Sequence, residues 1–90
     1  MKVVQCGLTQ AAVSQLYNLK ELILSENSLS RINVSKNTNM TNLVLDENLL
    51  ESIDLSALSK LEDLDLSVNQ LSEVDVSSNP CLKELSLYDN

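Results

Sequence analysis

Aliphatic residues recur along this chain with a fixed spacing of 21 residues. Two leucine columns and one asparagine column keep this spacing over four consecutive units. They are Leu22, Leu43, Leu64 and Leu85; Leu24, Leu45, Leu66 and Leu87; and Asn27, Asn48, Asn69 and Asn90. A fixed period of this length is typical of proteins in which one structural unit repeats and stacks on its neighbours.

Each unit contains two leucines separated by a single residue, as in Leu22-Ile23-Leu24. In a strand this spacing places both leucines on one side and the residue between them on the other. We therefore expect one short strand per unit, with successive strands parallel and about 4.8 Å apart. The asparagine after each strand is expected to satisfy backbone groups that the bend leaves unpaired. The four asparagines would then form a structural ladder along the stack.

Residues 19–29 read Leu-Lys-Glu-Leu-Ile-Leu-Ser-Glu-Asn-Ser-Leu. This segment resembles the signature LxxLxLxxNxL of the leucine-rich repeat family. A second copy, Leu29-x-x-Ile32-x-Val34-x-x-Asn37, is nested in the same unit, and the doubled pattern is similar to the bacterial 21-residue nested-period class called IRREKO repeats. The resemblance implies a leucine-rich-repeat solenoid, a right-handed coil of about four turns with mostly short parallel β-strands and little helix. It also implies a role in binding, usually of proteins, without indicating a ligand.

The repeats are expected to form a single domain. Repeats are predicted at 19–39, 40–60 and 61–81, with a partial repeat at 82–90 and an irregular N-terminal turn or cap at 1–18. The sequence ends directly after a predicted strand and within a repeat. Open strand edges and exposed apolar columns at the end of such a stack favour association. This ending therefore suggests an excised fragment, a synthetic protein or a subunit that assembles through its ends.

Two segments have alternative interpretations. The spacing and β-branched residues of Leu29-x-x-Ile32-x-Val34 favour a second short parallel strand in each turn. The alternative for this segment is a 3-10 or extended conformation. Residues 9–16 are either a helix, capped by Thr9, or a degenerate repeat turn.

The solvent side of the parallel sheet is the surface that the family resemblance associates with binding. The candidate partner-binding residues on it are Glu21, Ile23, Asn42, Val44, Asp63, Asp65, Glu84 and Tyr88. Like charges on neighbouring strands repel one another, so this face is not optimised for stability alone. One interpretation is attraction of a basic partner, with Ile23, Val44 and Tyr88 as anchors. The other is a negative surface that keeps the protein soluble.

Charge and composition argue against several classes of function. Thirteen acidic and six basic residues give a net charge of −7, which would repel the phosphates of a nucleic acid. The chain has no histidine, the commonest general base and metal ligand. It also lacks a phosphate-binding loop, a nucleophile motif and a dinucleotide fingerprint. We therefore expect no enzymatic activity and no cofactor. No signal peptide or transmembrane segment is recognised, and no membrane association is expected.

Metals and thiols add little to the predicted chemistry. Calcium held by Asp63, Asp65 and Glu84 is disfavoured because calcium loops need glycine at sharp turns and this chain has one glycine. The chain has no histidine and no paired cysteines to bind zinc, so no metal site is predicted. Cys6 and Cys81 would lie roughly 17 Å apart along the stack, too far for an intramolecular disulfide. Free thiols favour the cytoplasm or a recombinant protein without fixing the localisation.

These observations together predict a non-enzymatic protein-interaction module or repeat scaffold. Its acidic sheet face would bind a protein partner, and a basic surface is the complementary one. The alternative function is that of a structural protein, natural or designed, that self-associates through the uncapped ends of its solenoid.

Overall fold

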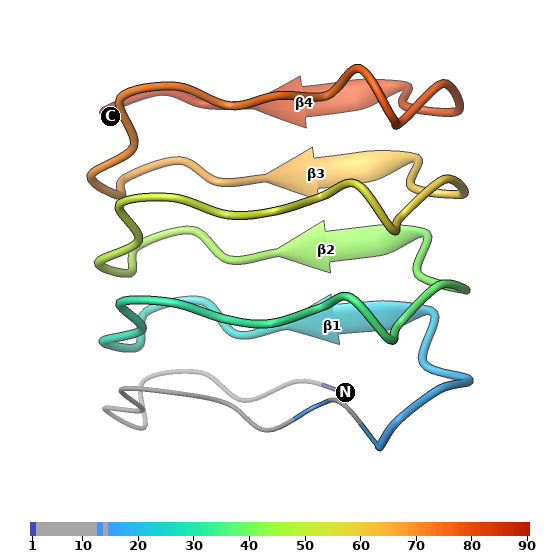
Figure 1. The fold of residues 1–90 in the computed structure, drawn as a ribbon. Helices are drawn as coiled ribbons and strands as arrows, with labels where there is room; N and C mark the ends of the chain where they lie inside the picture. The colour runs from blue at the N-terminus through green and yellow to red at the C-terminus, as the bar shows by residue number, and fades with distance from the viewer. Residues whose placement is uncertain (2–12, 14) are drawn as a thin grey trace.

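The computed structural model describes Met1, Val13 and residues 15–90 of the chain. Four short strands form one parallel sheet in the order β1-β2-β3-β4, and no helix occurs among the described residues. The strands are β1 (Glu21–Ile23), β2 (Asn42–Val44), β3 (Asp63–Asp65) and β4 (Glu84–Ser86). Figure 1 shows the strands stacked in one layer, while the segments between them return through a second layer.

The register of the sheet follows the 21-residue period of the sequence. In β1 and β2, Leu22 pairs with Leu43, and the same step pairs Leu43 with Leu64 and Leu64 with Leu85. Backbone bonding continues beyond the strands, since the N–H of residue 24 donates to the carbonyl of residue 44 at 2.9 Å. The prediction of short parallel strands at the paired leucines is therefore confirmed.

The leucine columns form the core between the two layers. Leu22 and Leu24 are completely buried, and so are the equivalent leucines of the second turn. The second layer, formed by the segments between the strands, is called the return layer. Its residues Leu29, Met40 and Leu50 are equally buried and pack against the strand leucines. Because each leucine contacts its equivalents in neighbouring turns, the core runs continuously along the stack. Because the chain has no tryptophan or phenylalanine, aliphatic side chains fill this interior.

Each return segment ends in the same tight turn before the next strand. The N–H of Asn37 donates to the carbonyl of Val34, and the N–H of Met40 donates to the carbonyl of Asn37, both at 3.1 Å. Equivalent pairs of bonds occur one turn earlier and one and two turns later, at residues 13–19, 55–61 and 76–82. Residues 13 and 15–19 thus follow the path of a repeat turn although their sequence is less regular.

The second strand predicted in each turn is not observed. Among the described residues, no backbone hydrogen bond joins residues 30–35 to residues 51–56, or residues 51–56 to residues 72–77. Instead, the Asn33 side chain accepts the N–H of Ser35 at 2.9 Å, and aspartates do the same one and two turns later. Side chains that bond locally to the backbone compete with a ladder between strands. The spacing of the aliphatic residues serves core packing here without a second sheet.

A residue in the left-handed region follows each strand and directly precedes the ladder asparagine. Glu26, Glu47 and Val68 have φ of 55° and Asp89 has φ of 56°. Left-handed φ brings Cβ close to the following carbonyl and costs about 1–2 kcal/mol for residues other than glycine. The recurring bend is therefore fixed by its surroundings and not by local preference, and the β-branched Val68 is the most strained of the four.

The N-terminal residue lies against the edge of β1. The Met1 amino group donates to the carbonyl of Glu21 at 2.8 Å, and the N–H of Ile23 donates to the carbonyl of Met1 at 2.9 Å. Residues 9–12 and 14, where a helix was one of two predictions, lie outside the described residues, and so does Cys6. In the described part of the chain, no helix has the length and apolarity to cross a membrane.

Candidate functional site

The sheet places seven of the eight predicted partner-binding residues on its outward side. Strand alternation points the leucines of β1 to β4 into the core and their neighbours in the opposite direction. The pairing aligns Glu21, Asn42, Asp63 and Glu84 in one row and Ile23, Val44, Asp65 and Ser86 in another. We call this surface the sheet face. Tyr88 lies two residues beyond β4, and its side chain is 62% exposed.

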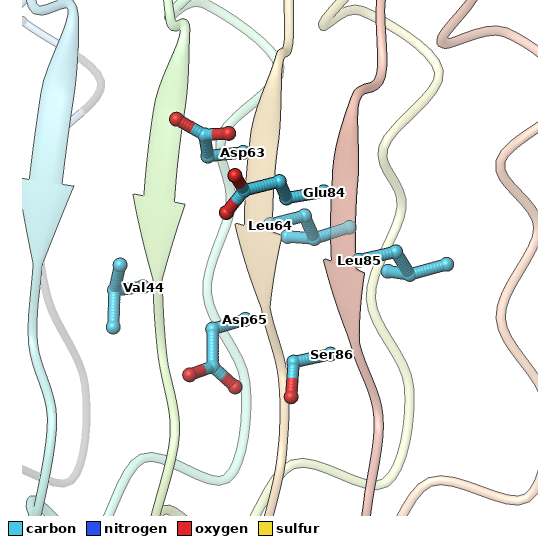
Figure 2. Close-up of a pocket in the computed structure, with 7 residues that line it drawn as sticks. All are labelled: Val44, Asp63, Leu64, Asp65, Glu84, Leu85 and Ser86. Atoms are coloured by element: carbon cyan, nitrogen blue, oxygen red, sulfur yellow. The ribbon is translucent and has the colours of Figure 1, made fainter.

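A shallow depression of about 360 Å³ lies over β3 and β4. It is lined by Val44, Asp63, Leu64, Asp65, Glu84, Leu85 and Ser86. Figure 2 shows the carboxylates of Asp63 and Glu84 close together at one end, with Asp65 and Ser86 further along the strands. The volume suits a single side chain and lies at the small end of the range for small-molecule sites.

The three carboxylates of this depression are not paired with a cation of the described chain. Among the described residues, none of Asp63, Asp65 and Glu84 forms an ion pair. The Nζ of Lys83, the nearest basic residue in sequence, lies 3.3 Å from a carboxylate oxygen of Glu62. One oxygen of Asp65 accepts the N–H of Ser67 at 3.0 Å, which orients that carboxylate.

The depression includes residues that the sequence interpretation assigned to the core or did not select. Leu64 and Leu85 belong to a core column, yet Leu85 is 42% exposed. No fifth strand covers it among the described residues, whereas the equivalent leucines of β1 to β3 are at most 2% exposed. Ser86 stands in the outward row beside Asp65, and its hydroxyl lies 2.8 Å from that of Ser67. The position of β4 at the end of the sheet is the signal that would have identified Leu85.

The predicted asparagine ladder connects successive turns through hydrogen bonds. The Nδ2 of Asn48 donates to the carbonyls of Leu24 and Leu45 at 3.0 Å and of Asp46 at 3.1 Å. Its Oδ1 accepts the N–H of Leu29 at 3.0 Å. Leu24 and Leu29 belong to the preceding turn. The Asn48 amide therefore closes its own bend and also bonds to the turn before it.

The same contacts recur along the asparagine column. Asn69 and Asn90 accept the N–H of Leu50 and Leu71 at 2.9 and 3.1 Å, and both donate to carbonyls of two turns. The Nδ2 of Asn27 donates to its own turn, to the carbonyl of residue 24 at 2.9 Å. Asn27, Asn48 and Asn69 are buried, whereas Asn90 is exposed in the last turn. These four side chains are structural and do not line the depression.

A second asparagine position occurs in every other turn of the return layer. The Nδ2 of Asn37 donates to the carbonyls of Val13 and Leu16 at 2.9 and 3.0 Å, and Asn79 makes the equivalent pair of bonds two turns later. The equivalent position of the turn between them holds Leu58, which makes no such bond. In both asparagines Oδ1 is buried without a hydrogen-bond partner in the described part of the chain. Each of these two asparagines therefore connects its own turn to the preceding one by hydrogen bonds.

Two aspartates of the return layer, Asp54 and Asp75, have structural partners. Asp54 accepts the hydroxyl of Ser56 at 2.6 Å and its N–H at 2.9 Å, and Asp75 accepts the N–H of Ser77 at 2.9 Å. The side-chain and backbone hydrogen bonds from these serines hold the pKa of both aspartates below the ordinary value of 3.8. Their charge is used to stabilise local turns.

Metal and thiol chemistry find no built site in the described residues. No group of three or more histidine, cysteine, aspartate or glutamate side chains is arranged to hold a metal ion in the described part of the chain. Cys81 carries an exposed free thiol next to Pro80. The sheet face with its depression is therefore the candidate functional site.

Comparison with known proteins gives no relative for this chain. No protein-family model, no curated protein and no solved structure matches it.

Proposed function

We propose that this chain is a leucine-rich-repeat solenoid that acts as a non-enzymatic protein-interaction module. In this proposal the sheet face is the binding surface, and its partner is a protein with a basic contact surface. The observation that carries the proposal is the group of three carboxylates, Asp63, Asp65 and Glu84, around one depression without a cation from the described chain. Complementary charge across an interface increases the association rate and selects among partners.

The strain within the sheet face also supports a role in binding. Asp63 and Glu84 are directly paired on β3 and β4, and like charges in this arrangement destabilise a sheet. A role in solubility alone does not require two carboxylates directly opposite each other on neighbouring strands. The half-buried Ile23 and Val44 add apolar contact area on the same side.

The experiment is a selection of binders from a displayed peptide library on the immobilised protein. Each selected binder is then tested on two double variants with the same change in net charge, Asp63→Lys/Asp65→Lys on the sheet face and Asp54→Lys/Asp75→Lys on the return layer. We expect most binders to lose affinity for the first variant and to keep it for the second. Binders that respond equally to both variants, or to neither, would contradict the proposed surface.

A second candidate function is self-association through the outer edge of β4. The observation that favours it is the 42% exposure of Leu85, which contrasts with the buried Leu22, Leu43 and Leu64 of the same column. Exposed strand edges pair readily with other chains. Light scattering over roughly a hundredfold concentration range, with reductant present, tests this function. Association that persists in Leu85→Lys would refute the edge as the contact.

A further inference from the structure

Along the stack, the sheet face carries apolar side chains on β1 and β2, beside Glu21 and Asn42, and none on β3 and β4. β1 and β2 contribute the half-buried side chains of Ile23 and Val44, whereas β3 and β4 contribute Asp63, Asp65 and Glu84. The depression lies across the boundary, since Val44 of β2 and the three carboxylates of β3 and β4 are all among its lining residues. Figure 2 shows Val44 on β2, across the depression from the strands that carry the carboxylates.

This combination of lining groups matches a side chain with an apolar stem and a cationic end. Lysine and arginine bury their methylene stems along apolar surface and keep the charge in a polar environment. Here Val44 supplies the apolar surface, and the carboxylates of Asp63, Asp65 and Glu84 supply the polar one. A guanidinium group has five donors in a planar fork and can bond two carboxylates together, whereas an ammonium group is a compact, strongly hydrated charge. Arginine is the better match for carboxylates that come from two neighbouring strands.

We propose that the partner inserts one arginine side chain into this depression and places an aliphatic side chain over Ile23. This proposal rests on the proposed function. β1 and β3 are two strand spacings apart, which is about 10 Å. Along an α-helix that crosses the strands, residues i and i+7 lie on one face and about 10.5 Å apart. The partner segment is therefore a helix with an arginine and an aliphatic residue seven positions apart.

Synthetic peptides provide the probe for this proposal. The first is an alanine-rich helix of about 20 residues, long enough to be helical in isolation, with leucine and arginine seven positions apart. In the second peptide, neutral citrulline replaces the arginine. In the third, lysine replaces it, and in the fourth the spacing is five residues, which moves the two side chains to different faces. Each peptide is titrated into the isotope-labelled protein, and the methyl signals of Val44 and Leu64 and the amide signal of Asp65 are followed by NMR.

The proposal predicts saturable shifts at Val44 and Asp65 with the first peptide. Binding of the citrulline peptide and of the five-residue spacing should be at least about tenfold weaker, and the lysine peptide should fall between. Equal binding of the arginine and citrulline peptides would overturn the assignment of the depression to a guanidinium group. Equal binding of the two spacings would overturn the helix.

A matched pair of protein variants separates this site from general charge attraction. Asp65→Asn keeps an oxygen that accepts the N–H of Ser67, so the fold is expected to persist. Asp54→Asn removes the same charge from the return layer, where Asn33 already occupies the equivalent position in the preceding turn. We expect Asp65→Asn to lower the affinity for the arginine peptide about tenfold and Asp54→Asn to leave that affinity unchanged. Equal losses in both would overturn the site.

Failure of this proposal is distinguishable from failure of the proposed function. Library binders that depend on Asp63 and Asp65 but tolerate citrulline in place of every arginine would refute the arginine contact and leave the sheet face as the binding surface. Binders that do not depend on these aspartates would refute both.

Discussion

Replacement of Asn48 by alanine tests the hydrogen-bond ladder at its centre. The carbonyls of Leu24 and Leu45 lose one donor but keep another, from Asn27 and Asn69 respectively. The N–H of Leu29 has only the Oδ1 of Asn48 as its described acceptor, so Asn48→Ala leaves a buried donor unpaired.

The expected loss of stability follows from this count of partners. An unpaired buried N–H destabilises by about 1–3 kcal/mol, and the weakened bonds to carbonyls that remain paired add less. We therefore expect Asn48→Ala to lower the free energy of unfolding by about 2–3 kcal/mol and the melting temperature by roughly 10–20 °C.

The assay is urea denaturation of Asn48→Ala beside Asn90→Ala. Asn90 makes equivalent bonds in the exposed last turn, where water replaces them more readily. Its replacement should therefore have the smaller effect. If Asn48→Ala unfolds within about 0.5 kcal/mol of the parent, or if Asn90→Ala is the more damaging change, the buried ladder does not hold the turns together.

Three further changes test the packing, the strained bend and the return-layer carboxylates. Leu66→Ala should destabilise by about 2–5 kcal/mol in the same urea assay, because Leu66 is fully buried in the core; a loss below 1 kcal/mol would argue against this packing. Val68→Asn should stabilise the protein by about 1 kcal/mol, because asparagine tolerates left-handed φ better than a β-branched residue. Glu47→Asn, at the same φ, should increase the stability less. A loss of stability in Val68→Asn would show that Val68 is not strained. The lowered pKa values of Asp54 and Asp75 contribute stability that is present above the ordinary value of 3.8 and is lost as pH falls through the folded pKa. Between pH of about 5 and 2.5, Asp54→Asn/Asp75→Asn should therefore lose less stability than the parent, and equal losses would show that the two carboxylates are not linked to folding.

Much of the sheet was predictable because one rule determines it. A leucine at positions 22 and 24, repeated every 21 residues, permits parallel strands with the leucines inward and leaves Glu21 and Ile23 on the outward side. The same rule placed the acidic residues of β3 and β4 beside one another. The register then required no further information.

The return layer was predicted less well because spacing alone does not identify hydrogen-bond partners. Leu29, Ile32 and Val34 have the spacing of a strand, but Asn33 bonds to the N–H of Ser35 and diverts the backbone from a second ladder. A sequence pattern reports which side chains are buried, and buried side chains occur in extended chain as well as in strands.

Two further features depend on tertiary context. The left-handed bend before each ladder asparagine has no glycine to mark it, and Glu26 or Val68 would not be selected for such a conformation. The depression was not predicted as a concave site because its shape depends on how residues of β2, β3 and β4 pack beside one another. Both features arise from stacking and not from local sequence.

The most direct test of the binding surface is the dissociation constant of one selected partner for three forms of the protein. The parent is compared with Asp63→Lys/Asp65→Lys and with Asp54→Lys/Asp75→Lys at low and physiological salt. A binding surface at the sheet face predicts a loss of at least about tenfold in the first variant, larger at low salt, and little change in the second. Equal affinities for the two variants would contradict the assignment of function to the sheet face.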